Sequence, residues 1–302
     1  MPEITLATQG DVDSMDGAVV ECNGEVAINR GAGNARVVQL KSGPPGPSLF
    51  LVPGTGGRIE GFADLAASLR TPMPVFAIEA RGLDKSSAPD ISVEEMAGHY
   101  LAQVRTVQAA GPYFLAGHSF GGLVVFEMAQ RLVEAKETVA CLIMLDAPVS
   151  ERYWPLPFYL NNLRARLRRH LTRILTNSVS ENVKFYFRRI ALRRANLDQM
   201  PTDVMIGSNV ARVLFAHGIA RKNYCPKFYP GKLTFFRPSE RSDDFEVLWR
   251  DWVRELEIHS VAGDHLSMID PPNVSSLAAD ISACLTKALA ATTPAPSSPL
   301  DS

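Results

Sequence analysis

Short apolar runs alternate along the chain with longer stretches in which apolar residues recur at helical spacing. The runs predict strands at 48–52, 74–79, 113–116, 139–145, 232–236 and 257–261. The helical patterns fall between and after them, at 59–70, 93–109, 123–133, 245–253 and 274–289. Strands that alternate with helices are typical of an α/β domain, in which helices cover both faces of a mostly parallel sheet.

The two ends of the chain depart from this pattern. Near the start, the short segments 18–22 and 25–28 flank Asn23-Gly24, the pair best suited to a two-residue turn between strands. Residues 1–37 are therefore predicted to be an N-terminal extension with a β-hairpin at an antiparallel edge of the sheet. Residues 292–302 are rich in Pro, Ser, Thr and Ala, which predicts a disordered tail.

The sequence Gly117-His118-Ser119-Phe120-Gly121-Gly122 joins a predicted strand to a predicted helix. A GxSxG motif in this setting predicts a nucleophile elbow, a sharp turn that holds the serine clear of the sheet. Ser119 is thus the candidate nucleophile. The backbone N–H of Phe120 would point at the oxyanion of a tetrahedral intermediate.

A serine nucleophile needs a base, and the chain has six histidines. His265 follows the strand 257–261, in a loop at the carboxyl end of the sheet, where α/β enzymes place their chemistry. It is the predicted general base and acid. The others are interpreted as surface or packing residues: His99, His118, His170, His217 and His259.

The imidazole needs a carboxylate partner that fixes its tautomer. Asp146 directly follows the buried run 139–145 and should lie at the same sheet edge as Ser119. Its rivals follow the strand 232–236, and they are Glu240, Asp243 and Asp244. Asp146 is favoured, although the order serine, acid, histidine holds for either choice. Asp264, next to the histidine, is interpreted as a loop residue or as a residue that supports the site without touching the substrate.

The loop 53–57, Pro-Gly-Thr-Gly-Gly, follows the strand 48–52 and should supply a second oxyanion donor. The backbone N–H of Thr55 is the predicted donor. A phosphate-binding loop is the competing interpretation, but no Gly-Lys-Ser/Thr ends this segment and GxGxxG is absent.

Together these motifs resemble the thioesterase domains that end nonribosomal peptide and polyketide synthases, which have the α/β-hydrolase fold. The resemblance covers about residues 38 to 290 and rests on 49–57, 79–84, 111–113, the elbow, 145–146, 229–234 and 263–265. It implies an acyl chain that arrives on a phosphopantetheine arm, is captured on Ser119, and is released to water or to a nucleophile within the chain. The family usually carries its acid at the position of Asp146. Free-standing editing thioesterases usually have methionine where this chain has Phe120, which favours the product-releasing type.

Composition narrows the function classes. The net charge of −1 gives no general attraction to nucleic acid, and the four scattered cysteines lack metal-ligand spacing. We therefore expect no metal, no cofactor and a reducing, cytoplasmic location. No window approaches 18 uncharged apolar residues and no secretory signal follows Met1, so we expect no membrane association.

The segment 151–228 interrupts the alternation and is predicted to be a helical lid, inserted between the first part of the core (38–150) and the second (229–291). Its residues 151–222 hold 14 Lys and Arg against 4 acidic residues. This excess is either a solvated face or an attraction for an acidic carrier protein and the phosphate of its arm. On the second interpretation, Arg221, Lys222 and part of the cluster 188–194 border the entrance.

Aromatic residues open the predicted lid at Tyr153, Trp154, Phe158 and Tyr159. They are candidate walls of an acyl channel, with ordinary packing between lid and core as the alternative.

Three function classes remain open. A thioesterase that releases a chain from a carrier is favoured, with the phosphopantetheinylated carrier in trans or in a longer parent chain. The second class is an esterase, amidase or acyltransferase for a free small molecule, because fold and triad do not set the substrate. The third is a non-catalytic ligand-binding relative, which the complete set of triad residues disfavours.

Overall fold

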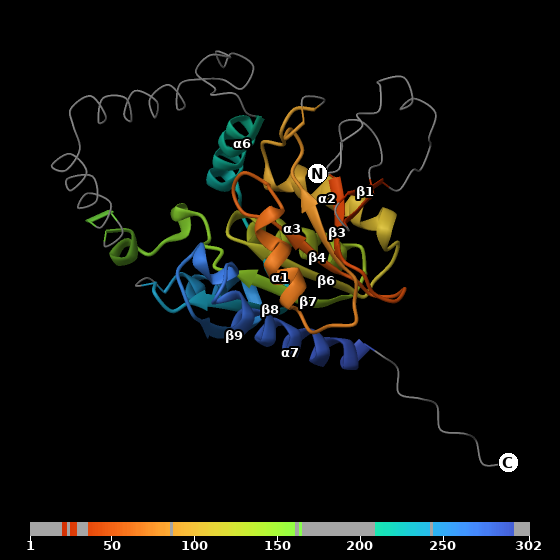
Figure 1. Cartoon of the computed structure of the whole chain (residues 1–302). Helices are drawn as coiled ribbons and strands as arrows, with labels where there is room; N and C mark the ends of the chain where they lie inside the picture. Colours follow the sequence, from red (N-terminus) through yellow and green to blue (C-terminus); the bar gives the residue numbers. More distant parts are fainter. Residues whose placement is uncertain are drawn as a thin grey trace.

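The computed structural model describes residues 20–22, 25–28, 36–84, 87–160, 163–164, 209–241 and 244–292. These residues form a nine-stranded sheet in the order β1-β2-β3-β5-β4-β6-β7-β8-β9 (Figure 1). The strands are β1 (Val20–Cys22), β2 (Glu25–Ile28), β3 (Arg36–Lys41), β4 (Leu49–Val52), β5 (Val75–Glu79), β6 (Tyr113–His118), β7 (Val139–Leu145), β8 (Tyr229–Pro238) and β9 (Val253–Val261).

The sheet is parallel from β5 to β9 and antiparallel at its other edge. β4 pairs in parallel with β5 and β6, and the parallel pairing continues through β7, β8 and β9. β1 and β2 form the predicted hairpin, which joins the sheet through β3. The predicted mostly parallel α/β sheet with an antiparallel edge is therefore confirmed. The turn residues 23–24 lie outside the described residues.

Helices cover both faces of the sheet. In the described part of the chain the helices are α1 (Ala63–Ser68), α2 (Val93–Val107), α3 (Phe120–Glu134), α6 (Asn209–Asn223) and α7 (Val274–Thr292), with short 3₁₀ helices η1 (Glu60–Phe62), η2 (Glu151–Tyr153), η4 (Phe245–Trp252) and η5 (Ser267–Ile269). α1 and α7 pack together on one face, and α2 and α3 on the other.

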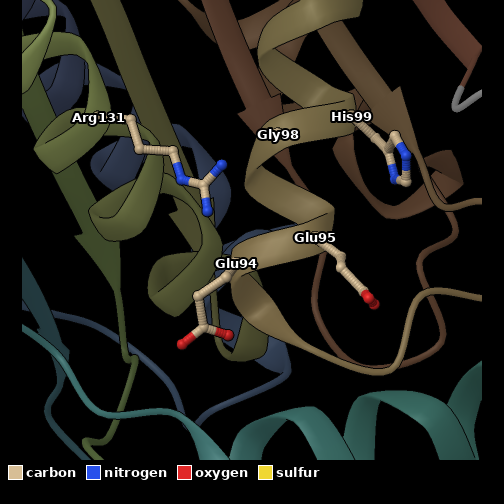
Figure 2. Close-up of a pocket in the computed structure, with 5 residues that line it drawn as sticks. All are labelled: Glu94, Glu95, Gly98, His99 and Arg131. Atoms are coloured by element: carbon tan, nitrogen blue, oxygen red, sulfur yellow. The ribbon is translucent and has the colours of Figure 1, made fainter.

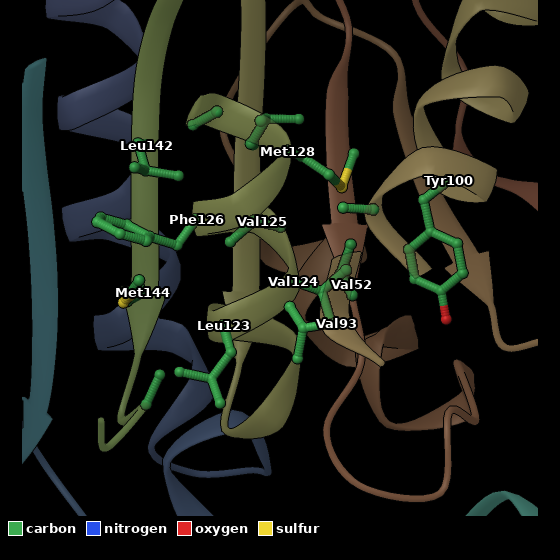
Figure 3. Packing of buried hydrophobic residues seen from close by; sticks show 14 of the residues in the cluster. Val52, Val93, Tyr100, Leu123, Val124, Val125, Phe126, Met128, Leu142 and Met144 are labelled. Atoms are coloured by element: carbon green, nitrogen blue, oxygen red, sulfur yellow. The ribbon is translucent and has the colours of Figure 1, made fainter. Parts of the chain in front are cut away.

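The apolar faces of the helices explain the two layers of the core. On the α3 side, Leu123, Val124 and Phe126 pack against strand residues such as Leu142 and Met144 (Figure 3). On the other side, Leu65 of α1 and Leu277 of α7 belong to a second buried cluster. Strands buried on both faces read as continuous apolar runs, which is why β4, β6 and β7 were predictable.

Two elements differ from the sequence-based predictions. β3 (Arg36–Lys41) was not predicted, although it pairs along β5 and places Val37 and Val38 in the core. The segment predicted as a helix at 245–253 is the 3₁₀ helix η4, and β9 already begins at Val253. η4 is anchored by the buried Trp249, whose indole N–H donates a hydrogen bond of 2.8 Å to the carbonyl oxygen of Ala147.

The described part of the predicted lid consists of η2, a helical turn at 156–160 and α6. The lid residues 165–208 and the tail residues 293–302 lie outside the described residues. By length and composition α7 could cross a membrane, but Leu277, Ala278 and Ile281 on one face of it are buried in the core.

Candidate active site

Ser119 sits in the strained turn that the elbow motif predicts. It links β6 to α3 with φ 54° and ψ −120°, a backbone conformation that is costly for a residue with a Cβ atom. The turn is fixed by two hydrogen bonds: Ser119 N–H donates to the Leu145 carbonyl oxygen at 2.8 Å, and Gly122 N–H donates to the Ser119 carbonyl oxygen at 3.0 Å. The serine therefore stands at the carboxyl end of β6, beside the end of β7.

The close approach of α3 to β4 requires glycine at position 121. A Cβ atom there would lie 2.2 Å from the carbonyl oxygen of Val52 and 2.5 Å from that of Pro53. Both are backbone atoms in the core of the sheet and cannot yield easily. Gly121 thus lets the start of α3 touch the strand that leads into the predicted oxyanion loop.

We expect Gly121→Ala to lower the free energy of unfolding by about 1–3 kcal/mol or more, because the added methyl overpacks the elbow. Gly218→Ala is the matched control, since a Cβ at that helical glycine meets no atom within 4 Å and alanine favours a helix. Chemical denaturation of both variants measures the difference. Equal stability of the two variants would contradict the packing described here.

The three predicted triad residues lie in hydrogen-bond contact. Ser119 Oγ lies 2.9 Å from Nε2 of His265, and Nδ1 of His265 lies 2.6 Å from Oδ2 of Asp146. The Asp146 side chain is only 1% exposed. The side chains of the rivals Glu240 and Asp244 are exposed, and Asp244 pairs with Arg237 at 2.8 Å; Asp243 lies outside the described residues.

Backbone hydrogen bonds fix the two segments that carry Asp146 and His265. Asp146 has φ 47°, and its N–H donates to the Phe236 carbonyl oxygen at 3.0 Å. The loop of His265 is closed by Asp264, whose Oδ1 accepts from the N–H groups of Leu266 and Ser267 at 2.9 and 2.8 Å. Asp264 thus has the loop contacts that one of its two interpretations predicts, and its charge also acts on His265.

His118 packs against His265. Its Nε2 lies 2.9 Å from the carbonyl oxygen of His265, and the two rings stack with centroids 5.0 Å apart. Burial lowers the pKa of His118 to about 4, so the ring is neutral at physiological pH and donates Nε2–H to the carbonyl. The interpretation of His118 as a packing residue holds, but the sequence did not show that it packs against the candidate base.

Arg241 contacts the other oxygen of the candidate acid, Oδ1 of Asp146. Sequence reasoning missed this residue. The pKa of His265 is lowered by burial first and by the positive charge of Arg241 second, while Asp264 opposes the shift. A lowered pKa leaves His265 neutral, and able to accept a proton, at a lower pH than an ordinary imidazole.

The predicted oxyanion loop lies against the serine and beneath the lid helix. A Cβ at Gly54 would lie 3.3 Å from Cβ of Ser119, and Thr55 next to it is exposed. The N–H of Gly56 lies 3.4 Å from Nδ1 of His217 on α6, whose ring stacks on Phe120 at a centroid distance of 4.5 Å. Phe120 is the first residue of α3, where backbone N–H groups have no partner within the helix. The Phe120 and Thr55 amides remain predicted donors.

The aromatic residues of the lid pack on the core. The ring centroids of Trp154 and Phe158 each lie 4.8 Å from that of Phe245 in η4, and the centroids of Tyr153 and Trp252 are 5.1 Å apart. Trp154 also donates its indole N–H to the Val149 carbonyl oxygen at 3.1 Å. These contacts are those of lid-to-core packing, and a role of these residues as channel wall stays a prediction.

Arg221 and Lys222 are exposed in the last turn of α6. The same helix carries His217 over Phe120, while Tyr224, just beyond the helix, lies 3.2 Å from Oε2 of Glu127 on α3. Lys and Arg at a helix C-terminus also interact favourably with the helix dipole, which gives their position a structural reason. The predicted basic cluster 188–194 lies outside the described residues.

A separate depression of about 330 Å³ lies between α2 and α3 (Figure 2). It is lined by Glu94, Glu95, Gly98, His99 and Arg131. No triad residue borders it, and Arg131 is engaged by Glu127 at 2.9 Å. Among the described residues, His, Cys, Asp and Glu form no group that could hold a metal ion.

Comparison with known proteins places this site in a family. Residues 47–285 match the family model described as "Thioesterase domain". The chain is 26% identical over 261 residues to the non-reducing polyketide synthase crz7 of Cladonia metacorallifera, and 38% identical over 111 residues to a dimodular nonribosomal peptide synthase of Bacillus subtilis (strain 168). These matches cover 77% and 37% of the chain but only 12% and 5% of the two synthases.

Solved structures show the same fold. The NocB thioesterase domain, in a covalent complex with a fluorophosphonate nocardicin G analogue, superposes with a TM-score of 0.56 at 23% identity, over 80% of this chain and 95% of that one. The four-domain nonribosomal peptide synthetase AB3403 gives 0.59 at 23% identity, over 81% of this chain and 20% of that one.

The chain belongs to the thioesterase domain family, with the α/β-hydrolase fold, and this family implies a serine hydrolase. It is related to the domains that release products from nonribosomal peptide and polyketide synthases, and the relatives above are such synthases.

Proposed function

We propose that this chain releases an acyl, peptidyl or polyketide chain from the phosphopantetheine arm of a carrier protein through an acyl-enzyme on Ser119. The observation that carries the proposal is the geometry at the strained elbow. Oγ of Ser119 lies 2.9 Å from Nε2 of His265, and Nδ1 of His265 lies 2.6 Å from Oδ2 of Asp146. The matched regions are small parts of much longer synthases, which supports a carrier as the bearer of the substrate.

The geometry supports the following steps. Ser119 Oγ attacks the thioester carbonyl carbon while its proton passes to Nε2 of His265, and Asp146 stabilises the imidazolium through Nδ1–H. The N–H groups of Phe120 and Thr55 hold the oxyanion. The intermediate then re-forms its carbonyl and breaks its C–S bond, and the proton on His265 goes to the departing pantetheine thiolate to give the thiol.

His265 then serves as base for the second half-reaction. It takes a proton from water or from a nucleophile within the acyl chain as that nucleophile bonds to the ester carbonyl carbon. The bond from this carbon to Oγ of Ser119 then breaks as the proton returns to Oγ. Hydrolysis and cyclisation use the same residues, so exclusion of water by the lid would decide between them.

The test compares three substrates that carry one acyl group: an acyl-carrier protein, an acyl-pantetheine thioester and a matched oxygen ester. We expect kcat/KM to rise from the oxygen ester to the acyl-carrier, and a fluorophosphonate to label Ser119. A higher kcat/KM for the oxygen ester, with no gain from the carrier, would support the alternative of an esterase for free small molecules. Failure of the fluorophosphonate to label the protein would favour a non-catalytic relative.

Reversal of charge at Arg221 and Lys222 should weaken association with the carrier. We expect Arg221→Glu/Lys222→Glu to lower kcat/KM for the acyl-carrier about tenfold at low salt, because opposite charges steer encounter and salt screens them. Hydrolysis of the acyl-pantetheine thioester should change little.

Arg254→Glu is the control for this double variant, because Arg254 is exposed near the start of β9, at the opposite end of the strand from the site. Steady-state rates at several salt concentrations measure the effect. Equal loss on both substrates would mean that the two basic residues support the fold.

A further inference from the structure

Arg241 follows β8 at the same sheet edge as the triad, and its guanidinium reaches the candidate acid. Nη1 of Arg241 contacts Oδ1 of Asp146, while Nδ1 of His265 lies 2.6 Å from Oδ2 of the same carboxylate. The two oxygens of one carboxylate are therefore divided between two partners. The Arg241 side chain is 17% exposed and that of Asp146 is 1% exposed, so this contact is largely shielded from solvent.

The packing of η4 and the lid holds Arg241 in this position. Its guanidinium carbon lies 3.8 Å from the ring centroid of Phe245, which is a cation–π contact. Phe245 in turn contacts the rings of Trp154 and Phe158, which also contact each other. The aromatic residues Trp154 and Phe158 at the start of the lid are thereby connected to Asp146 through Phe245 and Arg241.

The charge of Arg241 matters for both neighbours. A buried carboxylate without a compensating charge is costly, and Arg241 supplies that charge to Asp146. Among the described residues, the charged or titratable groups around His265 are Asp146 after β7, Arg241 after β8, Asp264 in its own loop and the neutral His118 from β6. Of these, Arg241 is the positive one, and it lowers the pKa of His265.

We propose that Arg241 is a positioning residue of this site, which orients the Asp146 carboxylate and offsets part of its charge so that His265 remains a neutral proton acceptor for Ser119. The inference rests on the proposed function. It fits thioester chemistry, because a thiol leaving group has a pKa of about 8.5 and needs less help from a strong acid or base than an amine does.

Arg241→Gln tests the proposal, because glutamine keeps a donor near Asp146 but removes the charge. The readout is the rate of Ser119 labelling by a fluorophosphonate as a function of pH, which needs no knowledge of the natural acyl chain. We expect the acid limb of the profile to move to higher pH. We also expect kcat/KM for an acyl-pantetheine thioester to fall about 10- to 100-fold, an effect of the size caused by loss of the outer partners of metal-binding histidines.

Two further variants separate positioning from folding. Arg241→Lys keeps the charge, so its acid limb should stay near that of the wild type even if its melting temperature falls. Arg105→Gln is the matched control, because Arg105 pairs with Glu137 at 2.7 Å outside the site. Its profile should equal that of the wild type.

A double-variant cycle with Asp146→Asn shows whether Arg241 acts through Asp146. In that case Arg241→Gln should cause little further loss of rate in the Asp146→Asn background. An unchanged acid limb in Arg241→Gln, an equal shift in Arg241→Lys, or fully additive losses would each overturn the inference. A different result would overturn the proposed function, namely near-normal turnover by a Ser119→Ala variant.

Discussion

Replacing Ser119 by alanine should lower kcat for an acyl-pantetheine thioester by roughly 10⁴- to 10⁶-fold, because no other group at the elbow can form the acyl-enzyme. The side chain faces His265 at 2.9 Å, and its loss removes the proton donor as well as the nucleophile. Steady-state kinetics and mass spectrometry of the trapped acyl-enzyme measure the effect. A wild-type protein incubated with substrate should gain the mass of one acyl group, and the variant should gain none.

The same variant should keep the fold, since serine and alanine meet the same strain at φ 54°. Its melting temperature should therefore lie close to that of the wild type, and a fluorophosphonate should no longer label it. Near-normal turnover by Ser119→Ala would end the acyl-enzyme proposal. Loss of activity together with a much lower melting temperature would mean that the serine supports the turn.

Much of the fold was predictable because burial leaves a clear mark on the sequence. β6 and β7 are covered on both faces and therefore consist of unbroken apolar residues bounded by turns. β3 escaped prediction because it mixes Arg36, Gln39 and Lys41 with its valines, as a strand near the edge of a sheet does. The apolar spacing of 245–253 predicts a helix but does not distinguish an α-helix from the 3₁₀ helix η4, which Trp249 and Phe245 anchor to Ala147 and to the lid.

The positions of the triad residues could be predicted for a topological reason. Parallel strands end at one edge, so Ser119 and Asp146, directly after β6 and β7, and the loop of His265 after β9 lie at the same edge of the sheet. The supporting residues could not be found in this way. His217 contacts Gly56 across 161 residues and His118 contacts His265 across 147, and neither pairing leaves a local pattern in the sequence.

Arg241 is an intermediate case. It follows β8 at the edge where rival acids were sought, so a search for bases as well as acids after each strand would have included it. The sequence alone does not show that the guanidinium of Arg241 packs on Phe245 and reaches Asp146.

Asp146→Asn should have the next largest effect, a fall in kcat of about 10⁴-fold, because asparagine holds the imidazole in the wrong tautomer. The shape of the site is kept, and the amide replaces a carboxylate that lies 2.6 Å from Nδ1 of His265. Glu240→Gln and Asp244→Asn are matched controls, since both side chains are exposed and follow β8. Both should retain nearly full activity. A greater loss in either control, or in Asp243→Asn, would reassign the acid.

The pH profiles of Asp146→Asn and Arg241→Gln should shift in opposite directions, which distinguishes the two variants even if both lose activity. Asp146→Asn removes a negative charge and leaves that of Arg241, so the pKa of His265 should fall and the acid limb should move to lower pH. Arg241→Gln removes the positive charge and should move the limb the other way. Labelling rates of the two variants between about pH 4 and 8, a span around the ordinary imidazole pKa, measure both shifts. Shifts of the same sign would contradict the arrangement in which Asp146 lies between His265 and Arg241.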